Sequence, residues 1–224
     1  MLSSALLFAI LAFAGCSGSS SDSESTPVPA SSQEPSRTPV AQSGIDSFRT
    51  GMESFRTKDF EVAASDLASA AESDPDNYEA SYYLGLSLVE LDRGLEAENA
   101  FKQAIDRKPD YAEAHYELGR LYFGRKEYEK SLPHLKEANK FKRSWPDALI
   151  LLGDNYRALK QFGYAAVPYG RAIGIDENRA DAYYGMGMNY IELGNTIAAR
   201  QQLRKLEPLD AELANELREK IGDQ

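Results

Sequence analysis

Few side chains in this sequence have the types and the spacing that catalysis needs. The chain has two histidines, His115 and His134, and one short glycine pair, Gly185-Met186-Gly187. A histidine can act as a general acid or base, but neither one belongs to a Ser-His-Asp order or to a metal-ligand spacing. A Gly-x-Gly segment indicates a phosphate loop only where a strand precedes it, and no strand pattern does so here. We therefore predict that the protein is not an enzyme and binds no cofactor and no metal ion.

The single cysteine, Cys16, is the side chain whose surroundings point to covalent modification. It follows an apolar run at residues 6–13, which is too short for an ordinary transmembrane helix but fits the apolar region of a signal peptide. One cysteine can form neither an intramolecular disulfide nor a thiolate zinc cluster. This arrangement therefore favours a signal peptide that ends at the cysteine.

Residues 13–16, Phe-Ala-Gly-Cys, resemble the lipobox of bacterial lipoproteins. The resemblance implies that residues 1–15 are a signal peptide and that cleavage leaves a lipidated Cys16 as the mature N-terminus. It also implies a lipid anchor in the bacterial cell envelope, where Ser17 favours the outer membrane and a chain that faces the periplasm. The alternative is an uncleaved apolar N-terminus in which the cysteine is incidental.

The next segment, residues 16–43, is rich in serine and proline and contains no aromatic residue. It lacks the apolar side chains whose burial could offset the lost backbone entropy, so we expect a disordered tether. The whole chain is acidic, with 35 Asp and Glu against 25 Lys and Arg and a formal net charge of −10. Because an acidic surface is unsuited to phosphate backbones, nucleic acid is not an expected partner.

From residue 44 onward the sequence repeats every 34 residues. Counted from residue 44, position 8 of each unit is a glycine, namely Gly51, Gly85, Gly119, Gly153 and Gly187. Position 20 is always Ala or Ser, whereas position 24 is large and reads Leu67, Phe101, Leu135, Tyr169 and Leu203. Small and large residues at such a fixed spacing are typical of two helices that cross closely.

This pattern is similar to that of the tetratricopeptide repeat family, which has Leu-Gly at positions 7 and 8, Ala at 20 and 27 and an aromatic residue at 24. The resemblance implies an all-α, right-handed superhelical solenoid over residues 44–210. Its five helix-turn-helix repeats are expected at 44–77, 78–111, 112–145, 146–179 and 180–213. Residues 210–222 form an amphipathic segment that we expect to be a capping helix; the alternative is a helix that binds a partner. In this register His115 packs between helices, and His134 lies on the exposed face of a second helix.

The resemblance also implies that the first helices of successive repeats line a concave groove. The residues that it places in this groove are Tyr82, Tyr83, Leu86, Tyr116, Arg120, Phe123, Ile150, Leu151, Asp154 and Tyr184. Aromatic and aliphatic side chains with a few charges are the composition of a polypeptide-recognition surface. We therefore expect a protein–protein interaction scaffold with a protein or peptide partner. The alternatives are a self-assembling envelope protein, whose groove packs against a second copy or the tether, and a regulatory subunit of a cell-wall or pilus/secretion assembly machine.

Overall fold

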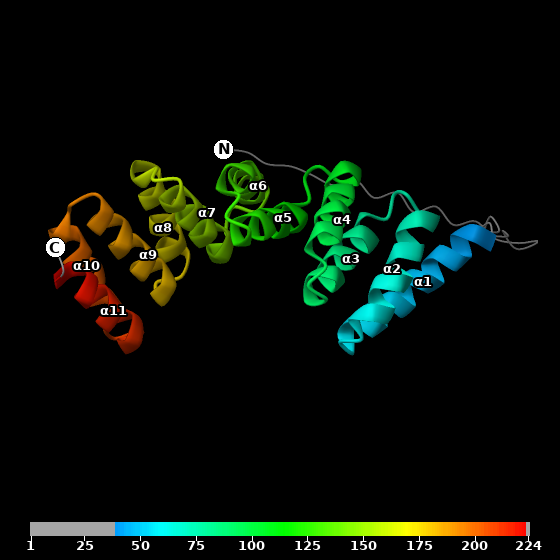
Figure 1. Ribbon diagram of the computed structural model, residues 1–224, viewed down its shortest axis with the longest axis horizontal. Helices are drawn as coiled ribbons and strands as arrows, with labels where there is room; N and C mark the ends of the chain where they lie inside the picture. The colour runs from blue at the N-terminus through cyan, green and yellow to red at the C-terminus, as the bar shows by residue number, and fades with distance from the viewer. Residues whose placement is uncertain (1–38, 223–224) are drawn as a thin grey trace, which may run out of the picture. The chain divides into compact units, whose positions relative to one another are not determined.

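The computed structural model describes residues 39–222, and every element found there is an α-helix. In chain order the helices are α1 (Pro39–Arg56), α2 (Phe60–Ser73), α3 (Tyr78–Glu90), α4 (Gly94–Arg107), α5 (Ala112–Gly124), α6 (Tyr128–Phe141), α7 (Pro146–Ala158), α8 (Phe162–Ile175), α9 (Ala180–Glu192), α10 (Thr196–Leu206) and α11 (Ala211–Gly222). Each helix packs against the one that follows it, from α1 in blue to α11 in red in Figure 1. The predicted all-α solenoid of five helical pairs and a final helix is therefore confirmed. The predicted signal peptide (1–15), Cys16 and most of the predicted tether (16–43) lie outside the described residues.

The first helix begins earlier than the repeat boundary predicted at residue 44. Helix α1 starts at Pro39, so residues 39–43, which we assigned to the tether, are helical. Proline suits the first turn of a helix, because that turn needs no amide donor and the fixed φ of proline is already helical. The helical part of the first repeat is therefore longer than the repeat pattern alone indicates.

Within each of the first four pairs, the two helices meet where the repeated glycine faces the large residue at position 24. A Cβ atom added at Gly85 would lie 2.5 Å from the Phe101 ring, and one added at Gly119 would lie 2.7 Å from Leu135 Cδ2. Gly51 faces Leu67 and Gly153 faces Tyr169 in the same way, at 2.8 and 2.7 Å. No side chain larger than hydrogen fits between these helices without moving one of them. The repeated glycine is therefore a packing requirement of each of these pairs.

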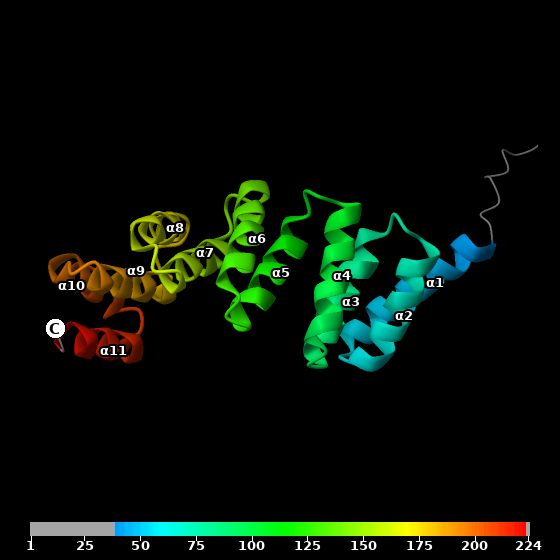
Figure 2. The same cartoon turned by 45° about the horizontal axis from the view of Figure 1, so that its top comes forward.

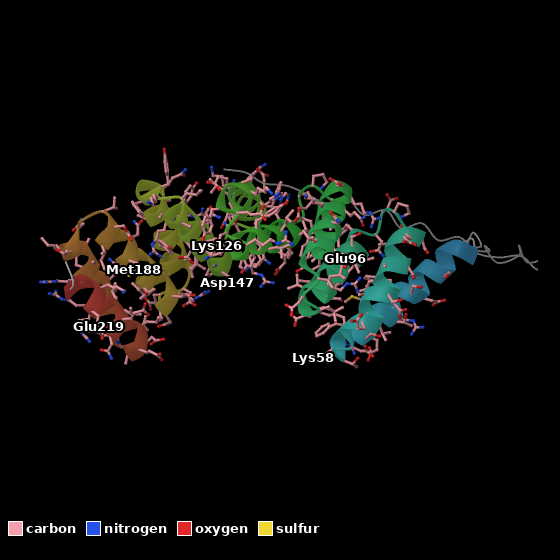
Figure 3. The ribbon with its side chains drawn as sticks, in the orientation of Figure 1. Lys58, Glu96, Lys126, Asp147, Met188 and Glu219 are labelled. Atoms are coloured by element: carbon pink, nitrogen blue, oxygen red, sulfur yellow. The ribbon has the colours of Figure 1, made fainter. Side chains whose placement is uncertain are left out.

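The turn between the two helices of a pair also has one repeated geometry. The residues at position 15 have positive φ, with values of 57 to 70°, and are Lys58, Asp92, Lys126, Lys160 and Gly194. At the first turn the Lys58 amide donates to the Phe55 carbonyl and the Asp59 amide to the Ser54 carbonyl, at 3.1 and 2.8 Å. This pairing is the Schellman motif, which satisfies the last carbonyl groups of a helix. Figure 3 labels Lys58 and Lys126 at two of these turns.

The final helix, α11, covers the apolar side of the last pair and lies beside α9 and α10 (Figure 2). Its buried residues Ala214, Leu217 and Ile221 share one core cluster with Tyr183 and Leu203. At Gly187 an added Cβ would lie 2.6 Å from Leu217 Cδ2, so this glycine faces α11. The apolar face of the amphipathic segment is therefore used inside the chain, as a capping helix requires.

A partly buried carboxylate joins the second pair to the third. Glu98 on α4 accepts hydrogen bonds from Tyr122 at 2.9 Å, Arg125 at 2.5 Å and Lys102 at 2.8 Å. Burial of the carboxylate alone would raise its pKa, but the hydrogen bonds from Lys102, Tyr122 and Arg125 outweigh burial and lower the pKa to about 2. Because Tyr122 belongs to α5 and Arg125 caps its C-terminus, this single side chain fixes the second helix of one repeat to the first helix of the next.

The two histidines lie next to this carboxylate and form a pair. His115 Nε2 donates to the Pro109 carbonyl at 3.0 Å, which leaves its Nδ1 to accept from Nδ1 of His134 at 3.2 Å. His115 is buried, as predicted, but the prediction of an exposed His134 is wrong, because its ring is half-buried and stacks on Tyr122. Burial lowers the pKa of His134 to about 4, and the neighbouring His115 adds to the effect. His134 is therefore neutral at pH 7, and the two rings belong to the packing between helices.

We expect Gly119→Leu to lower the free energy of unfolding by about 3 kcal/mol, because the new side chain overlaps Leu135. Chemical denaturation followed by circular dichroism measures this change. Gly163→Ala is the control, because a Cβ at Gly163 has no neighbour within 4 Å. That variant should be as stable as wild type or slightly more stable. Equal stabilities for Gly119→Leu and wild type would show that the glycine does not set the helix crossing.

Both partly buried groups should make the protein less stable in acid. His134 has a lower pKa in the folded state than its ordinary 6.5, so the unfolded chain takes up the proton first. Its contribution to stability is complete above pH 6.5 and is lost as the pH falls towards 4. The contribution of Glu98 is complete above pH 4.5 and is lost between pH 4.5 and 2.

Thermal unfolding of wild type should therefore shift to lower temperature between pH 7 and 4.5, and His134→Gln should reduce that shift. Glu98→Gln should be less stable than wild type at pH 7 but should lose less stability than wild type below pH 4.5. An identical pH dependence for wild type and His134→Gln would contradict the assigned pKa of His134.

Candidate functional site

Aromatic side chains of the first helices α1 and α3 lie close together, next to Tyr111, the residue that precedes α5. Tyr82 and Tyr83 on α3 have ring centroids 5.2 Å apart, and Tyr83 also meets Phe55 of α1 at 5.4 Å. Tyr82 in turn meets Tyr111 at 5.1 Å. These rings are half-buried and meet edge to face, the arrangement that aromatic pairs prefer. The structure therefore groups both predicted groove tyrosines of α3 in one aromatic cluster.

The hydroxyl groups of Tyr82 and Tyr111 remain protonated at physiological pH. Burial raises the pKa of Tyr82 above its ordinary value of 10, and the nearby Glu117 carboxylate raises it further. Burial has the same effect on Tyr111, where Tyr82 adds to the shift. The cluster therefore offers neutral hydroxyl groups that can donate a hydrogen bond to a carbonyl or carboxylate of a ligand.

A small cavity lies between α3 and α5, next to this cluster. It has a volume of about 240 Å³ and is lined by Val89, Glu117, Arg120, Leu121, Gly124 and Arg125. The Arg120 Nε atom donates to a Glu117 carboxylate oxygen at 2.7 Å, and the Arg120 side chain is 49% exposed against 13% for Glu117. Glu117 thus orients the guanidinium while its outer edge stays accessible. Leu86 is half-buried and packs against the core beside Val89.

A second aromatic contact joins α5 to the residue that precedes α7. Tyr116 of α5 meets the Trp145 ring at a centroid distance of 4.4 Å. The Lys142 ammonium lies 4.3 Å from the centroid of the same indole, and it also forms an ion pair with Glu113 at 2.8 Å. Trp145 is half-buried, so one part of the ring remains open to solvent. Our sequence reasoning did not include Trp145 in the candidate site.

Trp145 is one of a series of residues that end a repeat. Tyr111, Trp145 and Arg179 each occupy position 34, have extended backbone and precede a first helix as its N-cap. Each side chain contacts the preceding first helix: Tyr111 meets Tyr82, Trp145 meets Tyr116, and Arg179 pairs with Asp147 at 2.7 Å. The sequence signal that could have identified these residues is a large side chain at position 34, directly before α5, α7 and α9.

The fourth and fifth repeats differ from the predicted groove. Ile150 was predicted to line the groove, but its side chain is only 7% exposed and packs in the core with Leu149, Tyr169 and Ala182. The side chains of α9 explain the burial: Ala182 is small, and a Cβ at Gly185 would lie 2.5 Å from the Tyr169 ring. Because neither residue has a large side chain, α9 packs closely enough against α7 and α8 to cover Ile150. Leu151, the next residue, remains half-buried.

Other predicted residues are held by contacts within the chain. Asp154 accepts a hydrogen bond from the Tyr169 hydroxyl at 2.5 Å, and burial raises its pKa although this bond opposes the shift. Tyr184 donates to Glu216 of α11, and burial together with this bond raises its pKa to about 12. Phe123 meets Tyr128 of α6 edge to face at 5.3 Å. The accessible candidate site is therefore concentrated on α3 and α5, with Tyr82, Tyr83, Tyr116, Arg120 and Trp145.

Residues 39–222 contain neither a metal-binding cluster of side chains nor a membrane-crossing helix. In that part of the chain no group of three or more His, Cys, Asp or Glu side chains is arranged to hold a metal ion. No helix in the same range combines the length and the apolar character that crossing a membrane needs.

Comparison with proteins of known sequence finds larger relatives. The chain is 24% identical over 140 residues to tetratricopeptide repeat protein 37 of Xenopus laevis, a match that covers 59% of this chain and 9% of that protein. It is 27% identical over 153 residues to the protein O-mannosyl-transferase Tmtc3 of Drosophila melanogaster, which covers 66% of this chain and 16% of the relative. The chain thus spans well under a fifth of the length of either relative.

Solved structures show the same fold at low sequence identity. The protein YrrB, described as a TPR protein with an unusual peptide-binding site, is 21% identical with a TM-score of 0.72 over 79% of this chain and 92% of its own. A MamA structure is 22% identical with a TM-score of 0.71 over 78% and 95% of the two chains. MamA from Desulfovibrio magneticus RS-1 is 20% identical with a TM-score of 0.69 over 75% and 94%.

Sequence models of the family described as tetratricopeptide repeat match residues 48–98, 85–148 and 180–212. These segments make up more than half of the chain and contain four of the five repeated glycines that face a large side chain. The chain therefore belongs to the tetratricopeptide repeat family.

Proposed function

We propose that this protein is an interaction scaffold of the bacterial cell envelope that binds an extended partner polypeptide on the inner surface of α3 and α5. Proteins with this fold bind protein or peptide partners, and the peptide-binding site named for YrrB agrees with that role. The observation that carries the proposal is the pair of aromatic contacts, Tyr82–Tyr83 and Tyr116–Trp145, on neighbouring first helices. Accessible Tyr, Trp and Arg side chains at one place are typical of the residues that contribute most binding energy.

The chemistry of this surface favours a peptide with an apolar side chain close to an acceptor. A cavity of about 240 Å³ has room for one side chain of a ligand. The half-exposed Arg120 and the neutral tyrosine hydroxyls can donate hydrogen bonds to a carboxylate or a backbone carbonyl next to that side chain. Because Glu117 already orients Arg120, less rotamer entropy is lost on binding.

Peptides selected from a random display library on the purified full chain test the groove. Tyr116→Ala should weaken binding of the selected peptide by about 2 kcal/mol, because the side chain that anchors the peptide is lost from the surface while the core is intact. Arg120→Glu should weaken the binding of a peptide that has a carboxylate and should alter the salt dependence of that binding. Calorimetry measures both changes.

Tyr164→Ala is the matched control for this experiment, because Tyr164 is a 67% exposed tyrosine on the second helix α8. It should leave the affinity unchanged. If Tyr164→Ala weakened the peptide and Tyr116→Ala did not, the binding surface would lie on the second helices.

The envelope setting rests on the lipobox resemblance of residues 13–16. In a bacterial host, Cys16→Ser should abolish acylation and leave an unprocessed precursor of higher mass, because the thiol that accepts the lipid is gone. Metabolic labelling with a radioactive fatty acid and detergent-phase partitioning measure the change. Ser17→Ala is the control and should be acylated like wild type. Equal labelling of Cys16→Ser and wild type would show that no lipid is attached at this residue.

A further inference from the structure

The outer face of α8 lacks the charges that a solvent-facing helix normally carries. Its exposed residues are Gly163, Tyr164, Val167, Gly170, Arg171, Gly174 and Ile175, and Arg171 is the helix's single charged residue. The side chains of Tyr164, Val167 and Ile175 are 67, 64 and 43% exposed. A helix that is apolar on all sides is normally buried, whereas α8 leaves one such side uncovered.

The three glycines of this face have no packing role within the chain. A Cβ atom added at Gly163, Gly170 or Gly174 would have no neighbour within 4 Å, unlike the repeated glycines that face position 24. A glycine inside a helix is less favourable than alanine, so the chain loses stability here without an internal reason. A bare strip of helix backbone allows another helix to approach closely.

Basic side chains lie on both sides of this face. A cavity of about 440 Å³ between α6, α7 and α8 is lined by Lys136, Lys140, Arg143 and Arg171, together with Asn139 and Leu152. On the other side, a cavity of about 550 Å³ beside α10 includes Arg204 and Lys205 at its edge. All the ionisable side chains that line the first cavity, which is the more polar of the two, are basic. Lys140 forms an ion pair with Glu137 at 2.6 Å, whereas Lys136, Arg143 and Arg171 form no ion pair among the described residues. This positive charge contrasts with the net charge of −10 and favours an acidic occupant.

The same chain has an outer surface with the opposite properties. Helix α2 contains Glu61, Asp66 and Glu72 and no basic residue, and its other exposed residues are mainly small. A cavity of about 420 Å³ lies between α2 and α4, over an apolar floor that includes Ala64, Leu84 and Leu88. Its charged lining is Glu61, Glu96 and Arg93, and Arg93 pairs with Glu96 at 2.7 Å and lies 3.9 Å from Glu61. Its volume exceeds that of a tyrosine side chain. Val62 and Leu95 on these two helices are 44 and 75% exposed.

We propose that the outer face of α8 binds the outer α2–α4 surface of a second copy of this chain. Tyr164 and Val167 enter the α2–α4 cavity, the glycines allow α2 to lie close to α8, and the acidic residues of α2 face Lys136, Lys140 and Arg171. Because different surfaces meet, the contact is head-to-tail and leaves each end free to add a further copy. The contact uses the second helices of the pairs and is independent of peptide binding on α3 and α5.

Photo-crosslinking of the detergent-solubilised full chain tests this contact. With p-benzoylphenylalanine in place of Tyr164, ultraviolet light should give a product of twice the chain mass, with the crosslink in residues 60–107. Lys140→Glu combined with Arg171→Glu should lower the yield about tenfold, and Glu61→Lys combined with Glu72→Lys should do the same. Lys220→Glu, an exposed charge reversal on α11, is the control and should leave the yield unchanged.

Mixing the two double variants distinguishes lost complementarity from misfolding. The photo-reactive Glu61→Lys/Glu72→Lys chain retains the basic residues Lys140 and Arg171 beside its labelled α8, and the Lys140→Glu/Arg171→Glu chain retains the acidic residues of α2. The mixture should therefore regain the crosslink that each variant loses alone. Gly170→Gln should raise the thermal unfolding temperature, since glycine is the weaker helix former, and at the same time reduce the crosslink yield.

Three results would overturn the proposal. The first is a full chain that gives no dimer crosslink at any concentration, or crosslinks only to a different protein. The second is a dimer whose crosslink lies outside residues 60–107. The third is a yield that neither the charge reversals nor Gly170→Gln changes.

Discussion

In the first four repeats, the close contact between a glycine on the first helix and a large side chain on the second is the constraint on which the structure depends. At Gly85 and Gly153 the partner is an aromatic ring, and at Gly51 and Gly119 it is a leucine. Because nothing larger than hydrogen fits, the helix spacing in each of these pairs is fixed by backbone against side chain. The same spacing repeated every 34 residues sets where each following first helix begins.

This constraint determines which side chains are left for binding. The residues that fill the contact between packed helices are large and buried, as Leu118, Leu135 and Tyr169 show. Side chains on the opposite side of a first helix take no part in this contact and can differ between repeats. On α3 and α5 they are aromatic or charged and partly accessible, whereas on α7 Ile150 is covered by α9. The second and third repeats thus present partly accessible aromatic and charged side chains, whereas Ile150 of the fourth repeat is covered by the fifth.

The sequence was sufficient to predict the repeats, the all-helical class and the role of the repeated glycines, because these depend on residue size at a fixed period. It was insufficient where a neighbouring helix decides the outcome. Ile150 occupies a groove position, yet Ala182 and Gly185 on the next first helix allow it to be buried. His134 carries a polar side chain on a second helix, yet it packs against His115 and Tyr122. Both cases require distances between repeats, which the pattern of one repeat does not contain.

Our sequence reasoning also missed two local features, the turns with positive φ and the contact of Trp145 with Tyr116. The turns with positive φ carry lysine or aspartate in four repeats, and these residues do not stand out as glycine would. The Schellman hydrogen bonds and the adjoining helices hold them in this conformation. Trp145 precedes Pro146, which disfavours helical backbone at Trp145 and so directs its side chain towards Tyr116. Residues at repeat boundaries therefore contribute to the binding surface as well as to the turns.

The most direct measurement of the central constraint is a double-mutant cycle on Gly85 and Phe101. Gly85→Ala introduces a methyl group 2.5 Å from the Phe101 ring, whereas Phe101→Leu removes atoms of that ring and creates space. If the contact sets the helix spacing, Gly85→Ala should be strongly destabilising in wild type and less destabilising in the Phe101→Leu background. The coupling free energy should be about 1 to 2 kcal/mol by chemical denaturation. Additive effects of the two substitutions would contradict the account, because they would show that the helices are not held apart by this pair.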